Sequence, residues 1–62
     1  MDIEQKIDEV IAEYTHIFGK RDCFKTWVEN INCGEKYVVW CYYRYTWGNS
    51  RRTAKYRTTI RA

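Results

Sequence analysis

The stretch from Tyr37 to Trp47 constrains the fold more than any other part of this chain. Its eleven residues contain six aromatic side chains and two valines, and they include no glycine or proline. Aromatic and β-branched side chains favour a pleated, packed surface, so this stretch is expected to be a strand. Apolar residues occupy both odd and even positions. We therefore expect the central strand of a sheet, with something covering each face.

An amphipathic helix is expected from Asp2 to Phe18. Asp2 is placed to cap its first turn, and Gly19 can take the positive φ that ends a helix. Apolar residues recur at spacings of three and four, which places them on one stripe of the helix. They are Ile3, Ile7, Val10, Ile11, Tyr14, Ile17 and Phe18. This stripe needs an apolar surface to cover, and the sheet offers one.

Three strands are expected after the helix, at Phe24–Asn32, Lys36–Trp47 and Arg51–Ile60. The first turn contains Gly34, which is available for a positive φ. The second turn places Gly48 at the first position of a two-residue hairpin loop, as a type II′ turn prefers. The predicted fold is α+β, with the order α-β-β-β. One N-terminal amphipathic helix packs on a three-stranded antiparallel meander, in a single small domain over residues 1–62.

The two turns predict which residues pair across the sheet. Val28 should pair with Val39 in the first hairpin, and Cys41 should pair with Tyr56 in the second. Because side chains alternate between faces, the sheet then has a helix-side face and an open face, and a slip of one residue would exchange them. The helix-side face is predicted to hold Phe24, Thr26, Val28, Tyr37, Val39, Cys41, Tyr43, Ala54, Tyr56 and Ile60. The open face is predicted to hold Lys25, Trp27, Glu29, Ile31, Val38, Trp40, Tyr42, Arg44, Lys55, Arg57 and Arg61.

Charge is distributed unevenly along the chain. Residues 1–19 carry five acids and one base, whereas residues 20–62 carry ten bases and three acids, and no acid follows Glu35. Such asymmetry favours a polyanionic partner. The alternative is that the acidic helix partly neutralises the basic sheet and the surplus charge serves only solubility.

The open face carries the predicted binding surface, because a contiguous aromatic patch on a small domain needs an explanation. Its members are Lys25, Trp27, Trp40, Tyr42, Arg44, Lys55, Arg57 and Arg61. Trp, Tyr and Arg are enriched at protein-binding hot spots, so one hypothesis is a protein interface, either a homodimer or a complex with a foreign protein. The alternative is single-stranded RNA or DNA, with bases stacked on the rings and phosphates held by Lys and Arg. A third interpretation is structural, with cationic side chains simply covering the aromatic surface.

The tip of the second hairpin is a further candidate site, formed by Trp47, Asn49, Arg51 and Arg52. It is either an ordinary polar loop or a clasp for phosphate. Trp47 is assigned to the helix-side face, where it can lie beyond the helix end and extend a binding surface.

No catalytic, cofactor or metal motif is evident, so we expect a non-enzymatic protein without a small-molecule substrate. Cys23, Cys33, Cys41 and His16 are suitable zinc ligands by type, but they lack the closely spaced pairs of structural zinc sites. His16 has no group to orient it as a base and is expected on the surface. The chain begins without a signal peptide and has no apolar run of membrane-spanning length, so we expect a cytoplasmic protein with reduced thiols.

In size, lack of proline and aromatic density, the chain is similar to small accessory proteins of phages and mobile elements. That resemblance implies an inhibitor of a host protein. The expected element order also resembles the first four elements of the double-stranded RNA-binding domain, which ends in a second helix that this sequence does not provide. This second resemblance is one of element order alone, and it assigns no residue a role.

Overall fold

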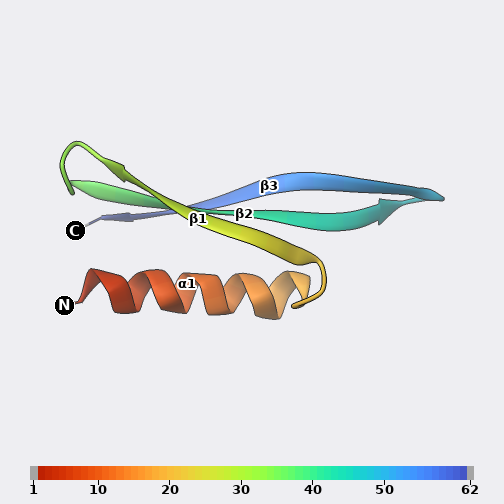
Figure 1. The fold of residues 1–62 in the computed structure, drawn as a ribbon, viewed down its shortest axis with the longest axis horizontal. Helices are drawn as coiled ribbons and strands as arrows, with labels where there is room; N and C mark the ends of the chain where they lie inside the picture. The colour runs from red at the N-terminus through yellow and green to blue at the C-terminus, as the bar shows by residue number, and fades with distance from the viewer. Residues whose placement is uncertain (1, 62) are drawn as a thin grey trace.

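The element order is α-β-β-β, which confirms the prediction. The computed structural model describes residues 2–61. Helix α1 (Ile3–Phe18) is followed by strands β1 (Cys23–Ile31), β2 (Lys36–Trp47) and β3 (Ser50–Arg61). The strands form one antiparallel sheet in the order β1-β2-β3, and α1 lies against one face of it (Figure 1).

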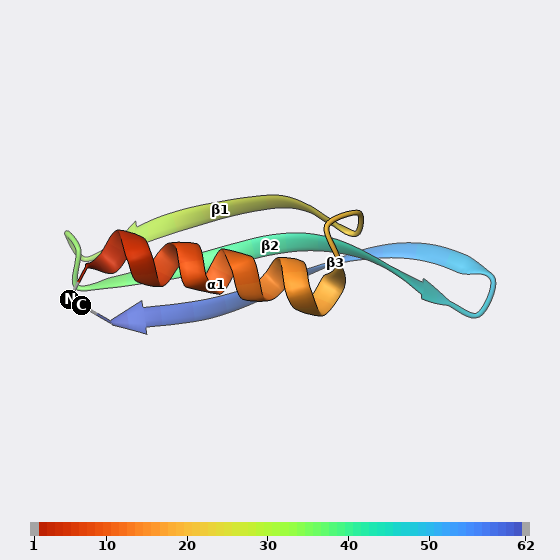
Figure 2. The ribbon, with the colours of Figure 1, turned by 90° about the horizontal axis from the view of Figure 1, so that it is seen from below.

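The helix is shorter than the strands that it covers. Sixteen residues of α1 span about 24 Å, whereas the twelve residues of β2 and of β3 span about 40 Å each. Strand β1 last pairs with β2 at Tyr43. Beyond that point β2 and β3 continue as a two-stranded ribbon past the end of α1 (Figure 2). We call this ribbon, residues 44–53, the hairpin arm.

The predicted register of the second hairpin is confirmed, and that of the first is confirmed from Lys25 onward but is wrong at Phe24, whose predicted partner Tyr43 pairs with Cys23 instead. Val28 pairs with Val39, and Cys41 pairs with Tyr56. The second turn is a two-residue loop between Trp47 and Ser50, with Gly48 at φ 60°. The first turn differs in one respect from the prediction, because Asn32 and Cys33 also have positive φ beside Gly34.

The core lies between α1 and the middle of the sheet. Its buried members are Tyr14, Val39, Cys41 and Ile60, and Ile3, Ile7, Val10, Ile11, Phe18, Cys23 and Tyr43 pack around them. The Tyr14 hydroxyl donates to the Val39 carbonyl at 2.7 Å and lies 2.6 Å from Thr58 Oγ1, whose own hydroxyl can donate back. The apolar stripe predicted for the helix therefore packs on the sheet as expected, with one exception. Ile17 is 57% exposed, because it lies at the edge of the stripe in the last helical turn.

The predicted position of Phe24 on the helix-side face is wrong. The pairing of β1 shifts between Cys23 and Lys25, which leaves Phe24 as an extra residue in a β-bulge. Cys23 then packs against the core, while the Phe24 ring stacks on Tyr42 on the open face, with centroids 5.9 Å apart. The bulge thus places the small thiol below the helix and the large ring on the opposite face.

Candidate functional site

Four rings form a stacked row on the open face, across β1 and β2. The row consists of Phe24, Tyr42, Trp27 and Trp40, and we call it the aromatic row. The Trp27 and Trp40 rings are nearly parallel, at 4°, with centroids 5.7 Å apart. The Trp27 and Tyr42 centroids are 5.0 Å apart. Because Trp27 pairs with Trp40 in the register, this is cross-strand aromatic stacking of the kind that stabilises sheets.

Cationic side chains lie over three of the four rings of this row. Lys25 Nζ is 5.6 Å from the Trp27 ring centroid, and Arg44 Cζ is 4.5 Å from that of Phe24. Two cations lie over Trp40, with Lys55 Nζ at 5.5 Å and Arg57 Cζ at 5.6 Å. These distances are within the range of cation–π attraction. Four of the five cations predicted for the binding face therefore contact a ring.

The aromatic row is covered more completely than the sequence alone indicates. Val38 is only 7% exposed although none of the helices and strands described within residues 2–61 lies over it, so neighbouring side chains cover it. Trp40 Nε1 is buried, and among residues 2–61 it has no hydrogen-bond partner. Trp27, Trp40 and Tyr42 are half-buried. The rings therefore contact one another and the cations, and Trp27, Trp40 and Tyr42 are partly covered while Phe24 stays 44% exposed.

The open face carries one sign of charge almost throughout. By their positions in the register, seven described cations lie on it, and Glu29 is the one described acid beside them. The cations are Lys25, Lys36, Arg44, Arg51, Lys55, Arg57 and Arg61. The acids Glu4, Asp8 and Glu13 are exposed on α1, which lies against the opposite face of the sheet (Figure 1). The charge asymmetry along the sequence thus becomes an asymmetry between two sides.

The hairpin arm is exposed over its whole length, from Arg44 to Thr53. Trp47 is 69% exposed, which confirms that it lies beyond the helix end. Asn49 is exposed at the turn between the strands. A hollow of about 400 Å³ lies where the arm begins, lined by Arg21, Arg44, Tyr45, Thr46, Arg51, Arg52 and Thr53. We call it the arginine hollow. The sequence carries no sign of Arg21, because no spacing rule places a loop residue beside a strand residue 23 positions later.

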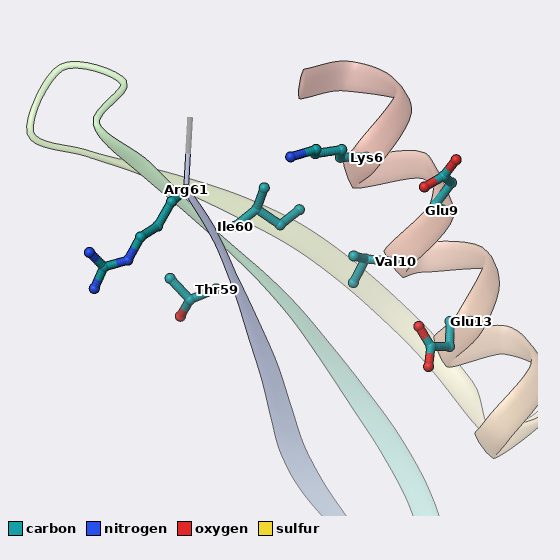
Figure 3. A pocket seen from close by; sticks show the side chains of 7 residues that line it. All are labelled: Lys6, Glu9, Val10, Glu13, Thr59, Ile60 and Arg61. Carbon is teal, nitrogen blue, oxygen red and sulfur yellow. The ribbon is translucent and has the colours of Figure 1, made fainter. Parts of the chain in front are cut away.

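A second hollow, of about 410 Å³, lies between α1 and β3 (Figure 3). Val10 and Ile60 lie between the two elements, while Thr59 and Arg61 point away from the helix. Lys6, Glu9 and Glu13 line the helix side. Arg61 is the one member of the predicted binding face in this lining, and the mixture of both charges favours no particular ligand.

The cysteines lie in three different environments. Cys41 is buried, Cys23 is half-buried, and Cys33 is exposed in the first turn. Burial raises the pKa of the Cys41 thiol to about 11, with a smaller contribution from the neighbouring Cys23. The bulge therefore brings Cys23 beside Cys41, which the predicted register alone does not. Within residues 2–61, no group of three or more His, Cys, Asp or Glu side chains is arranged to hold a metal ion.

No family model, curated protein or solved structure matches this chain. Among the described residues, no helix has both the length and the apolar character needed to cross a membrane.

Proposed function

We propose that this protein binds nucleic acid through phosphate contacts along the open face. The observation that carries the proposal is the layer of cations fixed over the aromatic row. Lys25, Arg44, Lys55 and Arg57 each lie within 5.6 Å of a ring centroid. Ring contacts restrict these long side chains before any ligand arrives, which lowers the entropy lost on binding. A line of such cations suits a phosphate backbone.

This geometry favours phosphate contacts over base stacking on the aromatic row. The large faces of Trp27 and Trp40 already contact each other, and Lys55 and Arg57 lie over Trp40. A base could stack there only if these side chains moved. Trp47 on the hairpin arm is 69% exposed, more than any ring of the aromatic row, and it is the ring most available to unpaired bases.

The salt dependence of binding tests the proposal. Fluorescence anisotropy with a labelled single-stranded oligonucleotide should show an affinity that falls linearly as the logarithm of salt concentration rises. With about five phosphate contacts the slope should be about −3.5, since each contact on a single strand contributes about −0.7. The double variant Lys55→Gln/Arg57→Gln should bind several-fold more weakly and reduce the slope by about 1.4.

Lys20→Gln is the matched control, because Lys20 is an exposed cation in the connection between α1 and β1, outside the open face. It should leave the slope nearly unchanged. A thermal melt of each variant separates lost contacts from lost folding. The proposal fails if the folded wild-type chain does not bind, or if the double variant binds with the wild-type slope.

A protein interface is the second candidate, and exposed apolar side chains on the helix-side face favour it. Past the helix end this face presents Tyr45 and Trp47, and Tyr56 and Ile17 are also exposed at the edge of the helix. A second copy of the chain packed there would form a homodimer and bury these side chains. The alternative protein partner is a host protein, as expected for a phage-type inhibitor. Apolar burial persists at high salt, so light scattering after size exclusion at low and high salt distinguishes a stable dimer from a salt-sensitive nucleic-acid complex.

A further inference from the structure

The arginine hollow concentrates positive charge at the start of the hairpin arm. Arg21, Arg44, Arg51 and Arg52 all line it, and its lining contains no acidic residue. Two of these arginines come from β3, one comes from β2, and Arg21 comes from the connection that precedes β1. Side chains alternate along β3, so Arg51 lies on the same face as Arg44 while Arg52 lies on the opposite face of the arm. Cations that line one hollow repel one another, and that repulsion is relieved when an anion enters.

Arg44 is held in place from two directions. Its guanidinium lies over the Phe24 ring at 4.5 Å, and its Nη1 donates to the Arg21 carbonyl at 3.2 Å. Its backbone N–H donates to the Asp22 carbonyl at 2.9 Å. The bulge therefore has a second consequence besides placing Cys23 on the helix-side face and Phe24 on the open face. It supplies the ring that orients Arg44 beside the hollow.

The backbone of β2 adds a donor at the same place. The Arg44 N–H points toward the β1 side of the strand, since it bonds to Asp22 there. Peptide groups two residues apart in an antiparallel strand point the same way, so the Thr46 N–H also points to that side. Strand β1 has already ended at this level. Backbone N–H groups and arginines together are the usual donors for phosphate oxygens.

The number of cations indicates which phosphate group fits best. A phosphodiester within a strand carries one negative charge, whereas a terminal phosphate monoester carries nearly two at neutral pH. Several arginines that line one hollow gain more from the second charge than a single extended row of cations does. Arginine also pairs with phosphate oxygens through two parallel hydrogen bonds, which a terminal group with three free oxygens accepts more readily.

We infer that the arginine hollow binds a dianionic phosphate monoester, the terminal phosphate of a nucleic-acid strand. The inference rests on the proposed function, in that it names the part of the nucleic acid that the hairpin arm holds. The rest of the strand then extends along the open face, whose cations continue from Arg44 toward Lys55 and Arg57.

One oligonucleotide sequence in three versions tests the inference: with a 5′-phosphate, with a 3′-phosphate, and with hydroxyl groups at both ends. One phosphorylated version should bind about tenfold more tightly than the hydroxyl version, as expected for added charge-assisted hydrogen bonds. The variant Arg51→Gln/Arg52→Gln should lose this preference. Arg57→Gln, a cation outside the hollow lining, should weaken binding of all three versions and keep the preference.

The outcomes separate the inference from the proposed function. Equal, salt-dependent affinities for all three versions would overturn the inference and leave nucleic-acid binding in place. If no oligonucleotide binds, the proposed function fails, and an NMR titration with a nucleoside 5′-monophosphate then decides about the hollow. If the Tyr45, Thr46 and Arg52 amide signals shift with the monophosphate but not with the unphosphorylated nucleoside, the hollow binds free nucleotides. Unchanged signals would overturn the phosphate site itself.

Discussion

The helix-covered half of the sheet and the hairpin arm are built from the same two strands, in one continuous register, and they differ in what lies on them. In the covered half, Val39, Cys41 and Ile60 are buried beneath Tyr14 of α1. In the arm, every residue from Arg44 to Thr53 is exposed. A two-stranded ribbon is marginally stable by itself, so the covered half supplies the folding free energy and holds the arm in place. Strand pairing can thus carry an exposed surface well beyond the core that supports it.

Removing the Tyr14 side chain should have the largest effect on stability. Tyr14 is 2% exposed, contacts Phe18 and Tyr56 through its ring, and reaches the sheet through its hydroxyl. Tyr14→Ala should cost about 3–5 kcal/mol, as for other buried aromatic side chains. A domain of this size rarely has more than about 5 kcal/mol in its core. Circular dichroism should therefore show no cooperative thermal unfolding. A variant that melts like the wild type would mean that the covered half does not support the fold.

Alkaline pH should weaken the covered half by a smaller amount. Burial raises the pKa of the Cys41 thiol from 9.0 to about 11. The unfolded chain ionises this thiol from about pH 9 while the folded chain keeps it neutral. The stability that it contributes is therefore complete below pH 9 and is lost as the pH rises toward 11. Two pKa units correspond to about 2–3 kcal/mol. Urea unfolding at several pH values measures the change.

Cys41→Ala is the control for this prediction, because it removes the thiol and leaves the other titrating groups in place. Its free energy of unfolding should fall less steeply than that of the wild type between about pH 9 and pH 11. Identical slopes in the two proteins would contradict the buried, neutral thiol.

A substitution in the hairpin arm should have the smallest effect on stability. Trp47 is 69% exposed and lies beyond the helix end. Trp47→Ala should change the free energy of unfolding by less than about 0.5 kcal/mol, which is typical of surface positions. A loss near that of Tyr14→Ala would show that the arm has a cover in solution, as a homodimer through the helix-side face would provide. Urea unfolding at two protein concentrations distinguishes that case, since the stability of a dimer depends on concentration.

The sequence predicts the helix, the strand order, the register of the second hairpin and that of the first from Lys25 onward, because each depends on a short-range signal. Gly48 fixes the second hairpin, and alternation then assigns every side chain of β3 to a face. The bulge at Phe24 leaves no such signal. Cys23 and Phe24 are both apolar, and only their sizes and their neighbours in space decide which one lies beneath the helix.

The candidate site is partly predictable for the same reason. Residues of the binding face follow from alternation, and Trp47 follows from the difference in length between the helix and the strands. Lys55, Arg57 and Arg44 cover the aromatic row only because their side chains bend over the rings. Alternation predicts the face on which each residue lies, but it does not predict the conformation of its side chain. The arginine hollow depends on the connection before β1, whose path is set by the bonds of Asp22 and Cys23 to Gly19 and of Arg44 to Asp22.

The acidic helix and the cationic open face give the molecule an electric dipole across its thickness. The two layers are separated along the intermediate axis, whose extent is 20 Å (Figure 1). The Debye length at physiological ionic strength is about 8 Å, so each side acts on its surroundings nearly independently of the other. The field of a polyanion would therefore rotate this protein as it approaches. The open face would then point toward the polyanion and α1 away from it before any contact forms. The formal net charge of +3 understates this attraction, because the side that arrives first carries far more positive charge than the whole chain.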